Sequence, residues 1–134
     1  MAGYSGKPLV DKLGIKAGAA IAIVNAPGGY ARTLGKLPAG MTRKAGVVGP
    51  LDFIQFFSSE KRSLEREFAR LARALTPAGM LWISWPKRSS GVATDLTEDV
   101  VRAIGLAHRL VDVKVAAVDD VWSGLKFVRR LQDR

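Results

Sequence analysis

The chain of 134 residues contains no cysteine and a single histidine. Without cysteine it has no disulfide, no thiolate nucleophile and no cysteine-based metal site. His108 has no motif partner for nucleophilic catalysis or metal ligation, so we expect it to cap a helix or to pack. No apolar run reaches the roughly 18 residues that a membrane span needs. We expect a cytoplasmic protein without membrane contact, metal or cofactor.

Acidic residues are scarce in the first third of the chain. No Asp or Glu occurs between Asp11 and Asp52. Residues 1–50 hold seven Lys or Arg against one acid, whereas residues 51–84 hold five against four and residues 85–134 hold nine against seven. The net charge of +9 therefore comes mostly from residues 1–50. Such an excess favours non-specific binding of nucleic acid through counterion release, which is one hypothesis for function.

The stretch from Leu51 to Trp85 has the pattern of a strand, a helix and a second strand. Residues 51–57 are rich in apolar residues that suit a strand, and residues 80–85 form a second such run. Between them apolar residues recur at helical spacing, and we expect Ser58 or Ser59 to cap this helix and residues 76–79 to end it. A right-handed parallel βαβ unit follows from this order.

The flanking segments extend this unit to one α/β domain over residues 1–134. After a lead-in at residues 4–6, we expect a short helix from Pro8 to Leu13 and a buried first strand at residues 19–24. Residues 31–37 predict a helical turn and residues 40–48 a short edge strand. Thr97 should cap a helix that runs to about His108. Alternation around residues 111–115 and 125–127 predicts an antiparallel hairpin at the sheet edge.

The chain resembles two groups of proteins, the first through its order of elements and the second through several stretches of sequence. The lead helix with Leu13-Gly14-Ile15-Lys16-Ala17-Gly18, the central βαβ unit, the helix from Thr97 and the final hairpin resemble a shortened class I S-adenosylmethionine methyltransferase, a mostly parallel, Rossmann-like fold. Over nearly its full length the chain also resembles a family of short bacterial proteins of unknown function. The stretches that carry the second resemblance are residues 1–6, 49–52, 85–87, 90–98 and 118–126. It implies a fold and no established activity.

The motifs that bind the methyltransferase cofactor are not matched. Such enzymes have an acidic residue before a glycine-rich turn after the first strand, where this chain has Val24-Asn25-Ala26-Pro27-Gly28-Gly29. They also have a carboxylate after the next strand that hydrogen-bonds a ribose, and here no acid lies between Asp11 and Asp52. The resemblance therefore implies a methyltransferase-like fold without the usual nucleoside site.

Two loops at the predicted carboxyl edge are candidate ligand sites. Asn25, Gly28 and Gly29 form either a remnant ligand loop or a glycine-rich turn. The second loop carries two cations and three hydroxyls that suit a phosphate or carboxylate, and its residues are Lys87, Arg88, Ser89, Ser90 and Thr94. The other interpretation of that loop is a solvated connection, because acidic residues begin the next helix.

Three further features have both a functional and a structural interpretation. Trp85 and Trp122 either stack on a ligand at one sheet edge or pack in the core. Arg62, Arg66, Arg70 and Arg73 form either a basic stripe for phosphates or the solvent face of the central helix. Asp119 and Asp120 are expected to be loop acids rather than a catalytic pair.

The leading hypothesis is a non-catalytic module that binds an anionic small molecule or a protein partner. A divergent S-adenosylmethionine-dependent methyltransferase, or a subunit of one, is the second hypothesis. Non-specific nucleic-acid binding is the third. The oligomeric state is left open by the sequence.

Overall fold

The structure, a computed structural model, describes residues 7–134. Its strands are β1 (Ala20–Val24), β2 (Thr42–Arg43), β3 (Leu51–Phe57), β4 (Leu75–Pro86), β5 (Leu110–Ala117) and β6 (Trp122–Arg129). Its helices are α1 (Leu9–Leu13), α2 (Tyr30–Leu34), α3 (Lys61–Ala74) and α4 (Glu98–Ala107), with 3₁₀ turns at Arg88–Ser90 and Leu131–Asp133. The lead-in expected at residues 4–6 lies outside the described residues.

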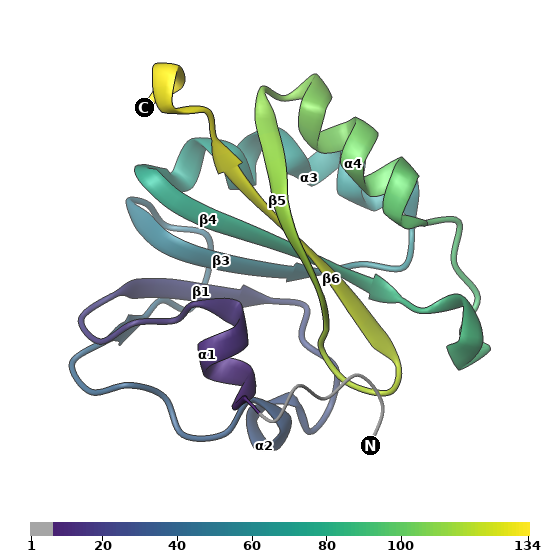
Figure 1. Cartoon of the computed structure of the whole chain (residues 1–134), viewed down its shortest axis with the longest axis horizontal. Coiled ribbons are helices and arrows are strands. Elements are labelled where there is room, and N and C mark those ends of the chain that lie inside the picture. Colours follow the sequence, from purple (N-terminus) through teal and green to yellow (C-terminus); the bar gives the residue numbers. More distant parts are fainter. Residues whose placement is uncertain (1–6) are drawn as a thin grey trace.

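The six strands form one sheet in the order β2-β1-β3-β4-β6-β5 (Figure 1). Strands β2, β1, β3 and β4 are parallel neighbours, whereas β6 runs antiparallel to both β4 and β5. The predicted α/β fold, with its mostly parallel sheet and its C-terminal antiparallel hairpin, is therefore confirmed. The hairpin adds β6 next to β4 and leaves β5 as the outer strand.

Apolar side chains fill both faces of the sheet. On one face α3 and α4 bury Leu64, Phe68 and Val101 against the sheet. On the other face α1 and α2 bury Leu13 and Tyr30. Figure 1 shows α3 and α4 together in the upper part of the view and α1 and α2 together in the lower part. Two layers of helices around a central sheet give this small chain two core clusters that share one sheet.

The amino end of α3 is closed by a residue from another loop. The helix begins at Lys61, whose backbone N–H donates to Oδ1 of Asp95 at 2.7 Å. The prediction that Ser58 or Ser59 caps this helix is therefore wrong: the Ser58 hydroxyl bonds to the backbone of Glu60, before the first helical residue. By contrast, Thr97 caps α4 as predicted, its hydroxyl accepting from Val100 N at 3.2 Å.

Strand β4 begins earlier than its sequence indicates. Leu75 pairs with Leu51, and the register then shifts so that Met80 pairs with Phe53. Residues 76–79 were expected to separate helix from strand, and they instead form the irregular start of β4. From Met80 the predicted strand is regular and runs to Pro86.

Candidate anion-binding site

The candidate site lies where β4 ends, at the edge where β1 and β3 also end. Open α/β sheets bind ligands at the carboxyl ends of their parallel strands. A cavity of about 550 Å³ opens there between the connection from β4 to α4 and the start of β6. Its lining consists of Trp85, Lys87, Arg88, Gly91, Val92, Ala93, Thr94, Leu96, Thr97, Glu98 and Ser123.

Two cations at this cavity have no partner among residues 7–134. Lys87 is half-buried and Arg88 is exposed, and neither side chain forms a hydrogen bond or ion pair there. Glu98 also lines the cavity, but its carboxylate lies 2.5 Å from Arg102, which neutralises it. The cavity therefore retains positive charge, which suits a phosphate or carboxylate.

The hydroxyl groups of the loop hold its shape. Ser90 donates to the carbonyl of Lys87 at 2.6 Å and accepts from Val92 N at 3.2 Å. Thr94 donates to the carbonyl of Ser59 at 2.6 Å and accepts from Leu96 N at 3.1 Å. These bonds fix the loop that carries Lys87. The predicted cluster therefore divides into cations without a partner in the described part of the chain and hydroxyls that hold the loop in place.

The two candidate tryptophans lie on opposite faces of the sheet. Trp85 pairs with Ser123 across β4 and β6, and Trp122 pairs with Pro86. Because neighbours along a strand point to opposite faces, one site cannot include both rings. Trp85 is 5% exposed and lies in the core cluster under α3 and α4, at the wall of the cavity. Trp122 instead packs edge-on against Phe57, with ring centroids 5.1 Å apart.

The glycine-rich loop after β1 is not part of this cavity. Asn25 is exposed, has a φ of 59° and donates from Nδ2 to the carbonyl of Phe57 at 3.5 Å. Gly29, with a φ of 81°, precedes α2. Since β3 separates β1 from β4, these loops begin about 10 Å apart. The structure therefore does not bring Asn25, Gly28 and Gly29 together with Lys87 and Arg88. Ser89 is exposed and also lies outside the cavity lining.

The residues around β1 and β2 do not fit the nucleoside cofactor of this fold. β2 ends at Arg43, which Lys44 follows, and both side chains are exposed. In the methyltransferases that this chain resembles, a carboxylate at this position accepts hydrogen bonds from the ribose hydroxyls. The side chains of Arg and Lys can only donate hydrogen bonds. A Cβ placed on Gly28 or Gly29 would meet no atom within 4 Å, so neither glycine is required by close packing within the chain.

A buried polar chain beneath the carboxyl edge was not predicted from the sequence. The hydroxyl of Tyr30 donates to Oε1 of Gln55 at 2.6 Å, and Nε2 of Gln55 donates to Oγ of Ser84 at 3.1 Å. Burial raises the pKa of Tyr30 far above its ordinary value, the Gln55 bond opposes this, and Asp119 adds to it. The chain joins α2, β3 and β4 by satisfied bonds. The sequence signal for this chain is the spacing on β3. Gln55 lies two residues from both Phe53 and Phe57, so its side chain shares their buried face of the sheet.

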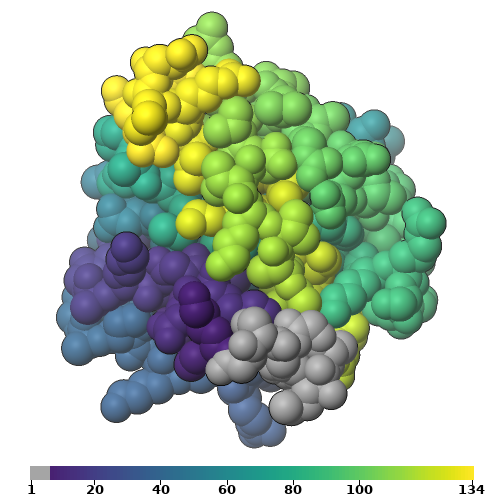
Figure 2. Space-filling model, in the orientation of Figure 1, coloured from purple at the N-terminus to yellow at the C-terminus, as the bar shows by residue number. Residues whose placement is uncertain are grey.

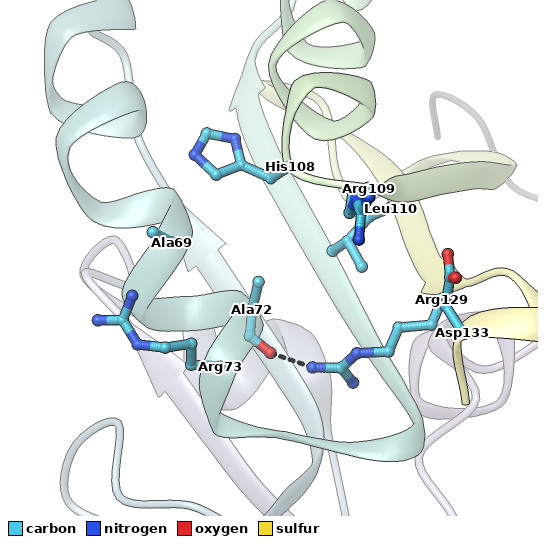
Figure 3. Close-up of a pocket in the computed structure, with 8 residues that line it drawn as sticks. All are labelled: Ala69, Ala72, Arg73, His108, Arg109, Leu110, Arg129 and Asp133. Carbon is cyan, nitrogen blue, oxygen red and sulfur yellow. Dashed lines mark hydrogen bonds between the residues drawn. The ribbon is translucent and has the colours of Figure 1, made fainter.

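A second cavity, of about 390 Å³, lies at the opposite edge of the sheet, where α3 and α4 end (Figure 3). Arg129 extends toward the end of α3 and donates to the carbonyls of Ala72 at 2.6 Å and Thr76 at 2.9 Å. His108 caps α4, with Nδ1 2.9 Å from the Ile104 carbonyl oxygen, and lies 4.8 Å from the Phe68 ring. Its predicted role in capping or packing is confirmed. These groups stabilise helix ends, which carry partial negative charge.

The arginines of α3 face solvent. Arg62, Arg66, Arg70 and Arg73 are exposed, whereas Leu64, Phe68 and Leu71 on the other side of the helix are fully buried. Arg70 and Arg66 both lie near Glu67, at 2.5 Å and 3.8 Å. Within residues 7–134 no group of His, Asp and Glu is placed to hold a metal ion. No helix in that range is long and apolar enough to cross a membrane.

Solved structures of S-adenosylmethionine-dependent methyltransferases have a fold similar to that of this chain. Magnesium protoporphyrin IX methyltransferase from Synechocystis PCC 6803 with bound SAM superposes with a TM-score of 0.59 at 11% identity, over 91% of this chain and 74% of the enzyme. A SAM-dependent methyltransferase from Aquifex aeolicus gives 0.61 at 14% identity, over 92% and 89%. A putative type 11 methyltransferase from Sulfolobus solfataricus gives 0.59 at 15% identity, over 97% and 94%.

No model of a protein family matches the chain, and no curated protein matches it in sequence. The structural matches cover at least 90% of this short chain. The predicted resemblance to a shortened class I methyltransferase is thus confirmed for the fold. Sequence identities of 11–15% support a shared fold but do not establish a shared activity.

Proposed function

We propose that this chain is a non-catalytic module that binds a small anionic molecule with an apolar part in the cavity beside Trp85. The observation that carries the proposal is a pair of cations, Lys87 and Arg88, that have no partner within residues 7–134 and lie at the rim of a cavity with an apolar wall. Trp85 and Leu96 contribute that wall. Binding pockets for small molecules combine an apolar lining with a few placed polar groups.

The rigidity of the loop supports binding at this place. Ser90 and Thr94 hold the loop through bonds to backbone atoms at 2.6 Å, and Asp95 ties it to the start of α3. A loop that is ordered before a ligand arrives loses less conformational entropy on binding. Phenyl phosphate combines an aromatic ring with a dianion, and a ligand of its size would bind with a Kd of about 1 mM or tighter.

Isothermal titration with phenyl phosphate tests this proposal. The wild type should bind, and the double variant Lys87→Met, Arg88→Met should bind at least about tenfold more weakly, because two charge-assisted bonds are lost. Arg62→Met is the matched control, since it removes an exposed arginine on α3 without touching the cavity. Equal affinities for the wild type and the double variant would overturn the proposal.

A second candidate function is methyl transfer, which the fold favours. The misfit at Arg43 and Lys44 weighs against it, since these cations stand where the ribose needs an acceptor. Titration with S-adenosylmethionine and with its demethylated product separates the candidates. Micromolar binding together with methyl transfer to an acceptor would establish the enzyme and contradict a non-catalytic module.

A further inference from the structure

Three lysines lie on the face of the sheet that α1 and α2 cover, where α1 meets the β5–β6 hairpin. Lys114 on β5 and Lys126 on β6 are directly opposed across the two strands. Lys16 follows α1 and lies close enough to Lys126 for its charge to act on it. Figure 2 shows this face, with the purple α1 segment beside the yellow-green hairpin. We call Lys16, Lys114 and Lys126 the lysine triad.

Without a bound anion, repulsion among the three lysines destabilises the folded protein. Like charges directly opposite each other on neighbouring strands destabilise a sheet. The Lys126 pKa is lowered, first by burial and then by the charges of Lys114 and Lys16. Within residues 7–134 none of the three forms an ion pair, and only Lys114 has a side-chain hydrogen bond, at 3.0 Å to the carbonyl of Lys12.

A cavity opens beside Lys16, one member of the triad. A cavity of about 350 Å³ is lined by Lys16, Gly14 and Met80, and the Nζ of Lys126 would lie 3.9 Å from a Cβ on Gly14. Asp52 also lines this cavity, but its two oxygens accept from Ala20 N at 2.9 Å and from the Thr76 hydroxyl at 3.2 Å. That carboxylate is therefore engaged with β1 and β4 and forms no ion pair with the triad.

We propose that the lysine triad binds a phosphate group. A dianion between three ammonium groups would remove their mutual repulsion and provide the acceptors that Lys16 and Lys126 lack among the described residues. This site lies on the opposite face of the sheet from the cavity at Trp85, and it does not depend on that cavity. The phosphate belongs either to a free phosphorylated molecule or to a nucleic-acid backbone.

Thermal unfolding with pyrophosphate at constant ionic strength tests the proposal. The Tm of the wild type should rise with pyrophosphate and saturate, because a ligand of the native state stabilises it. In Lys126→Met the Tm without ligand should equal or exceed that of the wild type, and the affinity for pyrophosphate should fall at least about tenfold. Lys36→Met, an exposed lysine after α2, is the matched control.

The variants also separate this site from the first one. The double variant Lys87→Met, Arg88→Met should retain the rise in Tm with pyrophosphate, so the two sites can fail independently. Competition with a short single-stranded oligonucleotide identifies the source of the phosphate: displacement of pyrophosphate indicates a nucleic-acid backbone, and no displacement indicates a free phosphorylated molecule. An absent rise in the wild type, or an equal rise in Lys126→Met, would overturn the proposal.

Discussion

The hydroxyl of Tyr30 donates a hydrogen bond of 2.6 Å to Oε1 of Gln55 inside the protein. Both residues are buried, at 4% and 0% exposure, and Gln55 passes the connection on to Ser84. This polar chain links α2 to the two central strands just beneath the carboxyl edge. It therefore supports the part of the fold from which the candidate loops extend.

Replacing Tyr30 with Phe should destabilise the protein. The Oε1 atom of Gln55 would lose its partner in a buried position, and we expect the free energy of unfolding to fall by about 1–3 kcal/mol. Urea denaturation measures this change. Ser89→Ala, in an exposed position without partners among the described residues, should stay within about 0.5 kcal/mol of the wild type. An unchanged stability for Tyr30→Phe would show that the bond contributes nothing.

The raised pKa of Tyr30 predicts that the folded protein loses stability at alkaline pH. Its pKa in the folded protein is raised by burial above the ordinary value of 10.0. The unfolded chain therefore releases this proton first, and the stabilising contribution is complete below pH 10.0 and declines as pH rises further. The slope of stability against pH above this value should be shallower in Tyr30→Phe. Parallel slopes in the two proteins would contradict the assignment.

Gly105 on α4 should not tolerate a larger residue. A Cβ at this position would overlap the ring of Phe127 on β6, which is fully buried. Gly105→Ala should lower the free energy of unfolding by about 1–3 kcal/mol or more, because the helix must move away from the sheet. Ala103→Gly, at an exposed position on the same helix, is the comparison and should cost about 1 kcal/mol through helix propensity alone. Gly105→Ala with wild-type stability would mean that α4 does not pack this closely.

Asp95 should link the candidate loop to α3. Its carboxylate accepts from Lys61 N at 2.7 Å, so Asp95→Ala should lower stability by about 0.5–2 kcal/mol, as for other lost helix caps. Hydrogen exchange should quicken both at the first turn of α3 and in the loop from Lys87 to Thr94. Faster exchange in the helix alone would show that the loop is held independently of Asp95.

The sequence predicted the order of elements and the fold because its strong signals are local. The period of Leu64, Phe68 and Leu71 and the capping by Thr97 depend only on near neighbours. The cap of α3 was not predictable in this way, because Asp95 lies 34 residues beyond Lys61. The early start of β4 depends on a register shift opposite β3, which the pattern of residues 76–79 does not reveal.

The candidate site was predictable only in part. Lys87 and Arg88 follow a strand end, so their place at the carboxyl edge follows from topology. The sequence does not show that Ser90 and Thr94 bond to backbone carbonyls, since hydroxyls in loops serve ligands and turns equally well. The lysine triad depends on the pairing of Lys114 with Lys126, and a bulge between Asp112 and Lys114 makes that pairing invisible to simple alternation.

The most direct test of the proposed anion site is a ¹H–¹⁵N titration of the protein with phenyl phosphate, read residue by residue. We predict saturating shifts at the amides of Gly91, Val92 and Ser123, which line the cavity, together with the side-chain signal of Trp85. These shifts should vanish in the double variant Lys87→Met, Arg88→Met. Saturating shifts that leave these residues unchanged, or no saturating shifts anywhere, would contradict the account.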